Sequence, residues 1–120
     1  LILNLYHDGL VESCHDISMG GAWIALIEMV LGERGNSFVG ITINLSDSQS
    51  ILADLFSENG GYIIATQNKE SVLARCENAG VHYKTLGKTT LDKTLSIATA
   101  TEQLEWHLDT LSKQWNIFNP

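Results

Sequence analysis

Near its start the chain contains an alternating segment, a glycine pair and an apolar run, in that order: Leu10-Val11-Glu12-Ser13-Cys14-His15-Asp16-Ile17-Ser18-Met19-Gly20-Gly21, and then Ala22–Leu31. Residues 10–16 predict a strand, residues 17–21 a loop, and Ala22–Leu31 a helix capped near Ser18 and ended by Gly32. This helix has almost no polar face, since Glu28 is its one charged residue. Such a helix belongs in a core or against a partner, so we also expect self-association through Ala22–Leu31.

The rest of the chain continues to alternate between strand and helix patterns. We predict further strands at 38–45, 62–66 (buried), 81–87 and 94–99, the last two as a hairpin, and helices at 1–8, 47–56, 68–79 and 102–115. The side chains predicted to face the core are Val39, Ile41, Ile43, Leu45, Ile51, Leu52, Leu55, Phe56, Val72, Leu73, Cys76, Leu104, Leu108, Leu111 and Trp115. We therefore expect one domain over residues 1–120 with an α+β fold, a layered mixed sheet of four to five strands with about four helices.

The chain is acidic and carries enough apolar residues to form a core. Its 120 residues include 14 Asp and Glu against 7 Lys and Arg, which gives a net charge of −7. Nucleic-acid and anionic-membrane surfaces need clustered cations, so we expect neither as a partner. No apolar run approaches the roughly 18 residues of a membrane span. Cys14 and Cys76 form no disulfide or zinc pattern, and we expect a cytoplasmic location.

The segment from His15 to Gly21 is the best candidate for chemistry. A carboxylate at a strand end, here Asp16, followed by a glycine turn into a helix, places a metal ligand beside free N–H groups. The same pattern also serves to turn the chain and cap the helix, and the residues alone favour that second role. Adjacent strand residues point to opposite faces, so His15 and Asp16 form no catalytic pair within the strand.

The other polar and aromatic residues have simple structural interpretations. We expect Cys14 to be a buried, inert thiol on the same strand face as Asp16. We interpret Glu58 as a turn carboxylate. The remaining histidines have no metal-site spacing and are placed at the surface or on a strand: His7, His82 and His107. The tryptophans are expected to anchor the core or an interface: Trp23, Trp106 and Trp115.

Several motifs in one order resemble a known family. They are Gly9-Leu10-Val11-Glu12-Ser13-Cys14-His15-Asp16-Ile17-Ser18-x-Gly20-Gly21, Ala25-Leu26-x-Glu28-Met29, Leu55-Phe56-Ser57-Glu58, Ala79-Gly80-Val81 and Leu86-Gly87-Lys88-Thr89. Together they are similar to the synthetase part of the phosphoribosylformylglycinamidine synthase family, within the aminoimidazole ribonucleotide synthetase-like superfamily. The first motif resembles the second of two copies of the C-terminal domain in that synthetase. Because the chain also begins with Leu1 and not Met, we expect it to be the C-terminal domain of a longer synthetase.

The resemblance implies an ATP-dependent ligase of purine biosynthesis. Such an enzyme converts formylglycinamide ribonucleotide, glutamine-derived ammonia and ATP to formylglycinamidine ribonucleotide, ADP and phosphate. Its fold would be that of the C-terminal domain of aminoimidazole ribonucleotide synthetase. Its cofactors would be ATP and Mg²⁺, and its partners the N-terminal domains of the same synthetase and a glutaminase subunit or domain. The family's catalytic histidine and main nucleotide ligands lie in other segments, so the resemblance implies no catalytic residue here and an inactive fragment, and leaves open whether the fragment alone binds any cofactor.

The resemblance also gives roles to residues of this chain. Asp16 matches a position where relatives place a metal-binding aspartate, which makes it a candidate Mg²⁺ contact. The candidate substrate- or phosphate-facing residues are Ser18, Gly20, Gly21 and Glu58.

Two departures from the family pattern favour a copy that no longer does chemistry. Met19 stands where the family usually has Asp, and Asn59-Gly60-Gly61-Tyr62 lacks the usual Arg. A loop without that guanidinium cannot hold an anion by a bidentate contact. The alternatives are a free-standing α+β nucleotide- or ligand-binding regulatory module, or another member of the same superfamily.

Overall fold

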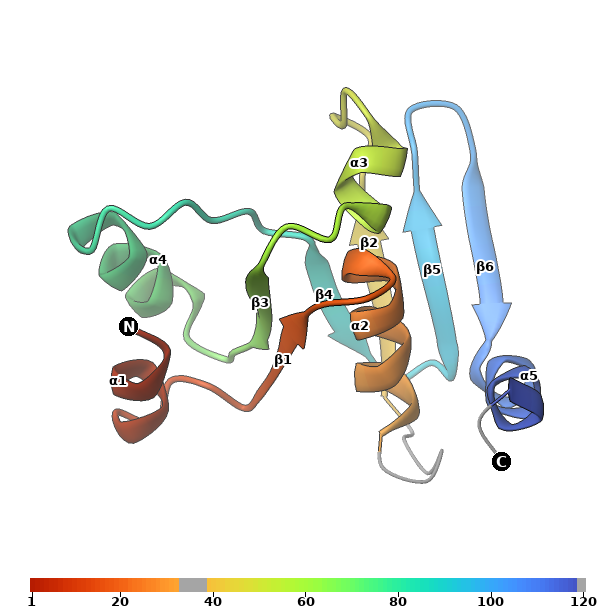
Figure 1. Cartoon of the computed structure of the whole chain (residues 1–120), viewed down its shortest axis with the longest axis horizontal. Helices are drawn as coiled ribbons and strands as arrows, with labels where there is room; N and C mark the ends of the chain where they lie inside the picture. Colours follow the sequence, from red (N-terminus) through yellow and green to blue (C-terminus); the bar gives the residue numbers. More distant parts are fainter. Residues whose placement is uncertain (33–38, 119–120) are drawn as a thin grey trace.

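The structure, a computed structural model, describes residues 1–32 and 39–118, and this part of the chain forms two sheets and five helices (Figure 1). In chain order the elements are α1 (Ile2–His7), β1 (Ser13–Ile17), α2 (Gly21–Leu31), β2 (Gly40–Asn44), α3 (Ile51–Phe56), β3 (Gly61–Ala65), α4 (Lys69–Asn78), β4 (Gly87–Thr90), β5 (Thr94–Ala98), β6 (Gln103–His107) and α5 (Leu108–Phe118). None of these helices has the length and apolar character needed to cross a membrane. The predicted start of a strand at Phe38 lies outside the described residues.

Four strands form the main sheet in the order β4-β2-β5-β6, and β1 pairs with β3 in a separate two-stranded sheet. Strands β2 and β5 run parallel, with Ile41 beside Leu95 and Ile43 beside Ile97, while β4 and β6 are antiparallel to their neighbours. A parallel pair needs a long crossover connection. Here the connection from β2 to β5 contains α3, β3, α4 and β4. The predicted α+β class with a mixed sheet is thus confirmed.

Helix α2 covers one face of the main sheet, and the core lies between them (Figure 1). Alternate residues of β2 and β5 face α2. Helix α5 packs at one end of the core between α2 and the main sheet. The buried residues of this core are Ala22, Ala25, Leu26, Ile27, Val30, Leu31, Ile41, Ile43, Leu45, Leu55, Ile63, Leu95, Ile97, Leu108 and Leu111. Burying each of the larger side chains contributes about 1.5–3 kcal/mol. The apolar helix therefore finds cover within the chain, and self-association through Ala22–Leu31 stays a prediction.

A smaller apolar cluster holds α1 against α4, away from the main sheet (Figure 1). Its residues are Leu5, Val72 and Cys76, with Leu10, Val11 and Ile64 packed around them. An exposed ion pair at its rim joins Arg75 Nη2 to Asp8 Oδ2 at 2.6 Å. Strand β3 links the two clusters, because Ile64 packs in the smaller one and its neighbour Ile63 in the main core.

The predicted hairpin of strands 81–87 and 94–99 is wrong. Residues 81–86 form no strand, and β4 begins only at Gly87 and pairs with β2, which lies between β4 and β5. A Cβ on Gly87 would lie 1.8 Å from the Thr42 carbonyl oxygen, and a Cβ on Gly40 would lie 2.0 Å from that of Asp92. Glycine at both positions lets the neighbouring backbone come this close. The alternating pattern of residues 81–87 does not reveal that β4 pairs with β2.

The predicted helix over residues 102–115 is wrong in its first part. Residues 103–107 form β6, and the Thr99 N–H donates to the Glu102 carbonyl at 2.8 Å in the turn from β5. Leu104 is therefore exposed on an edge strand, whereas Leu108 and Leu111 are buried as predicted. Strand β5 is buried, and its backbone groups need hydrogen-bond partners on both sides. Pairing with β6 supplies the second side, and this requirement outweighs the helical spacing.

Several apolar residues that we expected inside lie at the surface. Leu52 and Phe56 of α3 are exposed, and so is Val39 before β2. In β3, Tyr62 points outward while Ile63 is buried, so this strand is only half buried. Leu52 and Phe56 are exposed because α3 is short. Its six residues make less than two turns, so only one narrow face of the helix can point inward.

Candidate functional site

The segment predicted to carry chemistry forms a corner, residues 15–21 together with Glu58, where β1 ends and α2 begins. In the β1–β3 pair Asp16 lies opposite Tyr62, and His15 lies opposite the buried Ile63. Because strand side chains alternate, His15 faces α2 while Asp16 faces the other side. The Asp16 side chain is 65% exposed and that of His15 is 27% exposed. The Asp16 carboxylate is thus open to a ligand from outside.

Two different close contacts account for the two glycines of the corner, and at Gly20 a Cβ would lie 2.1 Å from Cγ1 of Ile24 in α2 itself. Both have positive φ angles, 84° at Gly20 and 67° at Gly21, in the region that favours glycine. A Cβ on Gly21 would lie 2.7 Å from the Leu55 carbonyl oxygen and 2.7 Å from the Phe56 carbonyl carbon. Gly21 therefore allows α3 to lie directly on the start of α2. The N-cap lies in the predicted region, but it is Gly20 and not Ser18, and the Ser18 carbonyl accepts from the Gly21 N–H at 3.1 Å.

Glu58 reaches the corner from the turn between α3 and β3. Its Oε1 accepts a hydrogen bond from the Gly20 N–H at 3.0 Å, across 38 positions of sequence. A carboxylate is favoured at a helix N-terminus because the N–H groups there lack intrahelical partners and carry partial positive charge. Glu58 therefore occupies a position in which α2 would otherwise receive an anion. An incoming phosphate has to share this N-terminus with Glu58 or displace it.

His15 contacts a residue that the sequence analysis did not assign to the site. Its Nε2 lies 2.7 Å from Glu28 Oε2, and its Nδ1 lies 2.7 Å from the backbone oxygen of Asp16. The Asp16 carboxylate is farther away, with Oδ1 3.7 Å from Nδ1. Both ring nitrogens thus lie within hydrogen-bond distance of an oxygen atom. The available signal was Glu28 itself, the one charge on an otherwise apolar helix.

Most of the chain, including the corner, matches a known protein family. Residues 1–99 match the family described as AIR synthase related protein, C-terminal domain. The chain belongs to this family. The match includes the whole corner and every strand through β5.

The relatives of this AIR synthase related domain are much longer than the chain. It is 35% identical over 107 residues to the phosphoribosylformylglycinamidine synthase subunit PurL of Lactobacillus helveticus, a match that covers 89% of the chain and 14% of the relative. It is 31% identical over 117 residues to the subunit of the same name from Thermus thermophilus, covering 95% of the chain and 15% of the relative. The chain therefore spans about a seventh of the length of these curated relatives.

Solved structures share the fold of this domain. The PurL of Thermotoga maritima, solved in complex with ATP, superposes with a TM-score of 0.73 at 18% identity, covering 92% of this chain and 20% of that one. The structure of PurLQS from the same organism gives a TM-score of 0.74 at 17% identity, with the same coverage. The predicted likeness to the superfamily's C-terminal fold is thus confirmed.

Asp16 is an exposed carboxylate that belongs to no complete metal site among the described residues. The described residues contain no group of three or more His, Cys, Asp or Glu side chains that could hold a metal ion. The neighbouring His15 is turned to Glu28 at 2.7 Å. Mg²⁺ is commonly bound by one or two carboxylates together with water and substrate phosphates. Asp16 fits that pattern only as one carboxylate contact to a Mg²⁺ ion that is also bound by a substrate phosphate.

Cys14 of the AIR synthase related domain lies beside Asp16 on the outward face of β1. It is exposed, so the prediction of a buried thiol is wrong. The pKa of the thiol is nevertheless raised, first by partial burial and second by the Asp16 carboxylate. A raised pKa reduces the thiolate fraction at neutral pH. This electrostatic setting agrees with the predicted lack of reactivity, although its cause is not full burial.

The structure brings together some of the predicted site residues and separates others. Glu58 and Gly20 are in direct hydrogen-bond contact, and Gly21 packs against α3. Ser18 is exposed and contributes its backbone carbonyl to the turn. Asp16 lies on the outward face of β1 and has no contact with Glu58 among those described. Met19, which stands where the family has Asp, is 83% exposed.

Proposed function

We propose that this chain is the C-terminal domain of a phosphoribosylformylglycinamidine synthase. The whole enzyme would convert formylglycinamide ribonucleotide, glutamine-derived ammonia and ATP to formylglycinamidine ribonucleotide, ADP and phosphate. The observation that carries the proposal is the 3.0 Å hydrogen bond between Glu58 and Gly20. It joins two of the five motifs on which the family resemblance rests, and relatives that the chain matches carry this enzyme name.

In this function the corner would bind and position a phosphate group and its Mg²⁺ ion, and it would contribute no catalytic residue. Asp16 would contact Mg²⁺ carried by a phosphate group, because its carboxylate is open to the outside. Gly20 and Gly21, beside Ser18, would form the turn that faces a phosphate, and the Gly20 N–H would donate to that phosphate only after Glu58 has been displaced. Glu58 would hold the loop in place and limit access to the helix N-terminus. ATP and Mg²⁺ would supply phosphoryl transfer to the whole enzyme.

The partners of the domain would be the rest of the synthetase and a source of ammonia. We propose contacts with the N-terminal domains of the same polypeptide and with a glutaminase, either a separate subunit or a fused domain. The similar fold in PurLQS of Thermotoga maritima supports an assembly of this kind. A cytoplasmic location fits a pathway of soluble metabolites.

One observation favours the alternative of a binding or regulatory module. Glu58 already holds the start of α2, and the described residues offer no three-ligand metal cluster. A domain with this corner retains the fold and can bind a ligand without taking part in the reaction. In the whole enzyme this is the expected behaviour of a second copy of the domain.

The experiment is an assay of the native protein that contains this sequence, compared with the 120-residue chain alone. ADP release is measured with ATP, Mg²⁺, ammonia and formylglycinamide ribonucleotide. We expect substrate-dependent ADP release from the native protein and none from the chain. A native protein whose ADP release does not depend on the ribonucleotide would overturn the synthase proposal and leave the binding module.

A further inference from the structure

A cavity of about 640 Å³ lies beside the main sheet, at the edge formed by β2, β4 and the preceding segment 84–86. We call it the lysine groove, after the three lysines among its lining residues: Lys69, Lys84 and Lys88. It shares no lining residue with the corner. Its volume is within the range of roughly 300–1,000 Å³ that is typical of small-molecule sites.

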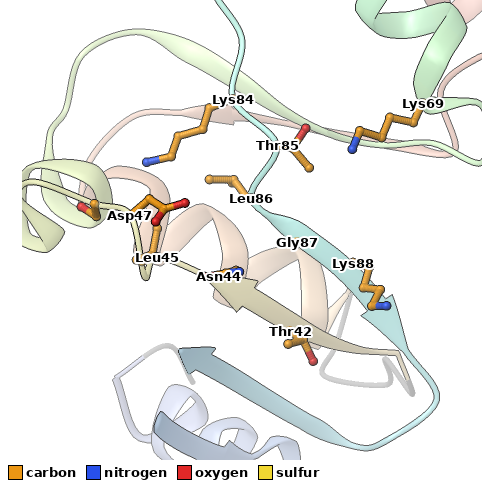
Figure 2. A pocket seen from close by; sticks show the side chains of 11 residues that line it. Thr42, Asn44, Leu45, Asp47, Lys69, Lys84, Thr85, Leu86, Gly87 and Lys88 are labelled. Carbon is orange, nitrogen blue, oxygen red and sulfur yellow. The ribbon is translucent and has the colours of Figure 1, made fainter. Parts of the chain in front are cut away.

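The lysine groove concentrates positive charge in an acidic protein. Three of the 7 Lys and Arg residues line it, in a chain with a net charge of −7. They come from three places: Lys69 begins α4, Lys84 precedes β4, and Lys88 lies within β4. Figure 2 shows Lys84 and Lys88 toward the two ends of segment 84–88, with Lys69 across from Thr85. A cleft lined by one sign of charge attracts ligands of the opposite sign.

Two of the three amines have no carboxylate partner in the described part of the chain. Lys84 is paired, because its Nζ lies 2.7 Å from Asp54 Oδ2. No ion pair is formed there by Lys69 or Lys88. One lining carboxylate, Asp47, opposes them. The unpaired positive charge of the groove thus exceeds its unpaired negative charge.

Hydrogen bonds within the groove use acceptors and leave donors available. Asn44 Oδ1 accepts from the Ser46 N–H at 3.0 Å and from Ser46 Oγ at 2.6 Å, which leaves the amide NH₂ of Asn44 to donate. Ser96 Oγ donates to Thr42 Oγ1 at 3.3 Å, which leaves the Thr42 hydroxyl hydrogen. Thr42 and Lys88 are register partners in β2 and β4, so their side chains share one face of the sheet. Anions are the ligands that such a set of donors binds.

We propose that the lysine groove binds a small molecule with two or more linked phosphate groups. The two amines without a carboxylate partner, those of Lys69 and Lys88, come from different elements, α4 and β4. Two linked phosphates offer a separate anionic group to each of these amines, which a single phosphate does not. The proposal is independent of the synthase reaction and of the corner, since it rests on other residues.

The test measures how fast each lysine is acetylated by a limiting amount of N-hydroxysuccinimidyl acetate, with peptide mass spectrometry of the native protein. The probe is inorganic pyrophosphate, compared with sodium chloride at the same ionic strength. Lys113, exposed on α5, is the internal control. At a pyrophosphate concentration about ten times its Kd, mass action predicts about tenfold slower acetylation of Lys69 and Lys88. Equal acetylation with both salts, or equal slowing at Lys113, would overturn the proposal.

Variants and a second ligand sharpen the result. Lys69→Gln and Lys88→Gln should each weaken pyrophosphate binding about tenfold in calorimetry, because each removes a charge-assisted hydrogen bond, while Lys113→Gln should not. Unchanged binding in both groove variants contradicts the proposal. If ADP protects at lower concentrations than pyrophosphate, the diphosphate belongs to a nucleotide. If the two protect equally, the groove recognises the phosphate groups alone.

Discussion

The corner and the lysine groove use their polar groups in opposite ways. In the corner, Glu58 is bound to Gly20 and His15 to Glu28, so the recognisable motif residues are largely engaged with one another. In the groove, Lys69 and Lys88 form no ion pair in the described residues, although no sequence motif pointed to both. A family motif can therefore mark residues that mainly build the fold, as in the corner, or a charge that is available to a ligand, as with Lys88 of Leu86-Gly87-Lys88-Thr89.

The largest expected effect is on the stability of the corner. Gly21→Ala places a Cβ 2.7 Å from backbone atoms of α3 at a positive φ angle. We expect a loss of about 3 kcal/mol or more in the free energy of unfolding, since neither helix can move without disturbing the core. The measurement is the urea midpoint followed by circular dichroism.

Gly9→Ala is the matched control for this change. Gly9 also has a positive φ angle, 69°, but a Cβ there would have no atom within 4 Å. Gly9→Ala should lower the free energy of unfolding by only about 1 kcal/mol, the cost of holding alanine at a positive φ angle. If the two variants lose the same stability, crowding against α3 is not what fixes the glycine of the corner.

A smaller effect should follow from opening the N-terminus of α2. Glu58→Ala leaves the Gly20 N–H without its carboxylate, and we expect a loss of about 1 kcal/mol, as for other helix caps. Glu58→Gln keeps an oxygen acceptor and should lose less. Added phosphate should raise the melting temperature of Glu58→Ala more than that of the unaltered chain, because the site is no longer occupied. Equal responses to phosphate would mean that Glu58 does not compete with an anion.

The groove offers a weaker, pH-dependent effect through Asp54. Hydrogen bonds from Lys84 and then from Ser48, at 2.7 and 2.5 Å, hold the pKa of Asp54 below its usual value. A lowered folded-state pKa stabilises the fold above about pH 4, the usual pKa of an unfolded Asp, and this gain is lost as the pH falls through the lowered value. Asp54 is well exposed to solvent, so the contribution should be below about 1 kcal/mol.

The check is the pH dependence of unfolding in Asp54→Asn. Between pH 6 and pH 3 this variant should lose less stability than the unaltered chain. Glu12→Gln, which removes an exposed carboxylate in the segment before β1 and away from any helix start, is the control and should follow the unaltered chain. Parallel curves for all three proteins would show that the contact with Lys84 does not persist in solution.

The same contrast explains how much the sequence could predict. The apolar helix α2 and the alternation of β2 follow from local patterns, and both were predicted correctly. The hairpin of β5 with β6 was missed because Leu104, Leu108 and Leu111 also have helical spacing, and the need of buried β5 for a second partner is not local. The contact of His15 with Glu28 and the assembly of Lys69, Lys84 and Lys88 depend on tertiary packing in the same way.

The smallest effect concerns the open carboxylate of the corner. Asp16 is the second cause, after partial burial, of the raised pKa of Cys14. Replacing Asp16 by Asn should lower the pKa of the thiol part of the way to its usual value and so increase the thiolate fraction at pH 8. We expect alkylation of Cys14 by iodoacetamide to become faster by less than about threefold, because water and salt screen an exposed charge.

Glu105→Gln on β6 is the control for that last change, since it removes one negative charge outside the two-stranded sheet and should leave the rate unchanged. The buried Cys76 reports whether the fold has opened, because its alkylation should stay slow in both variants. An Asp16→Asn variant in which Cys14 reacts no faster would mean that the carboxylate is turned away from the thiol.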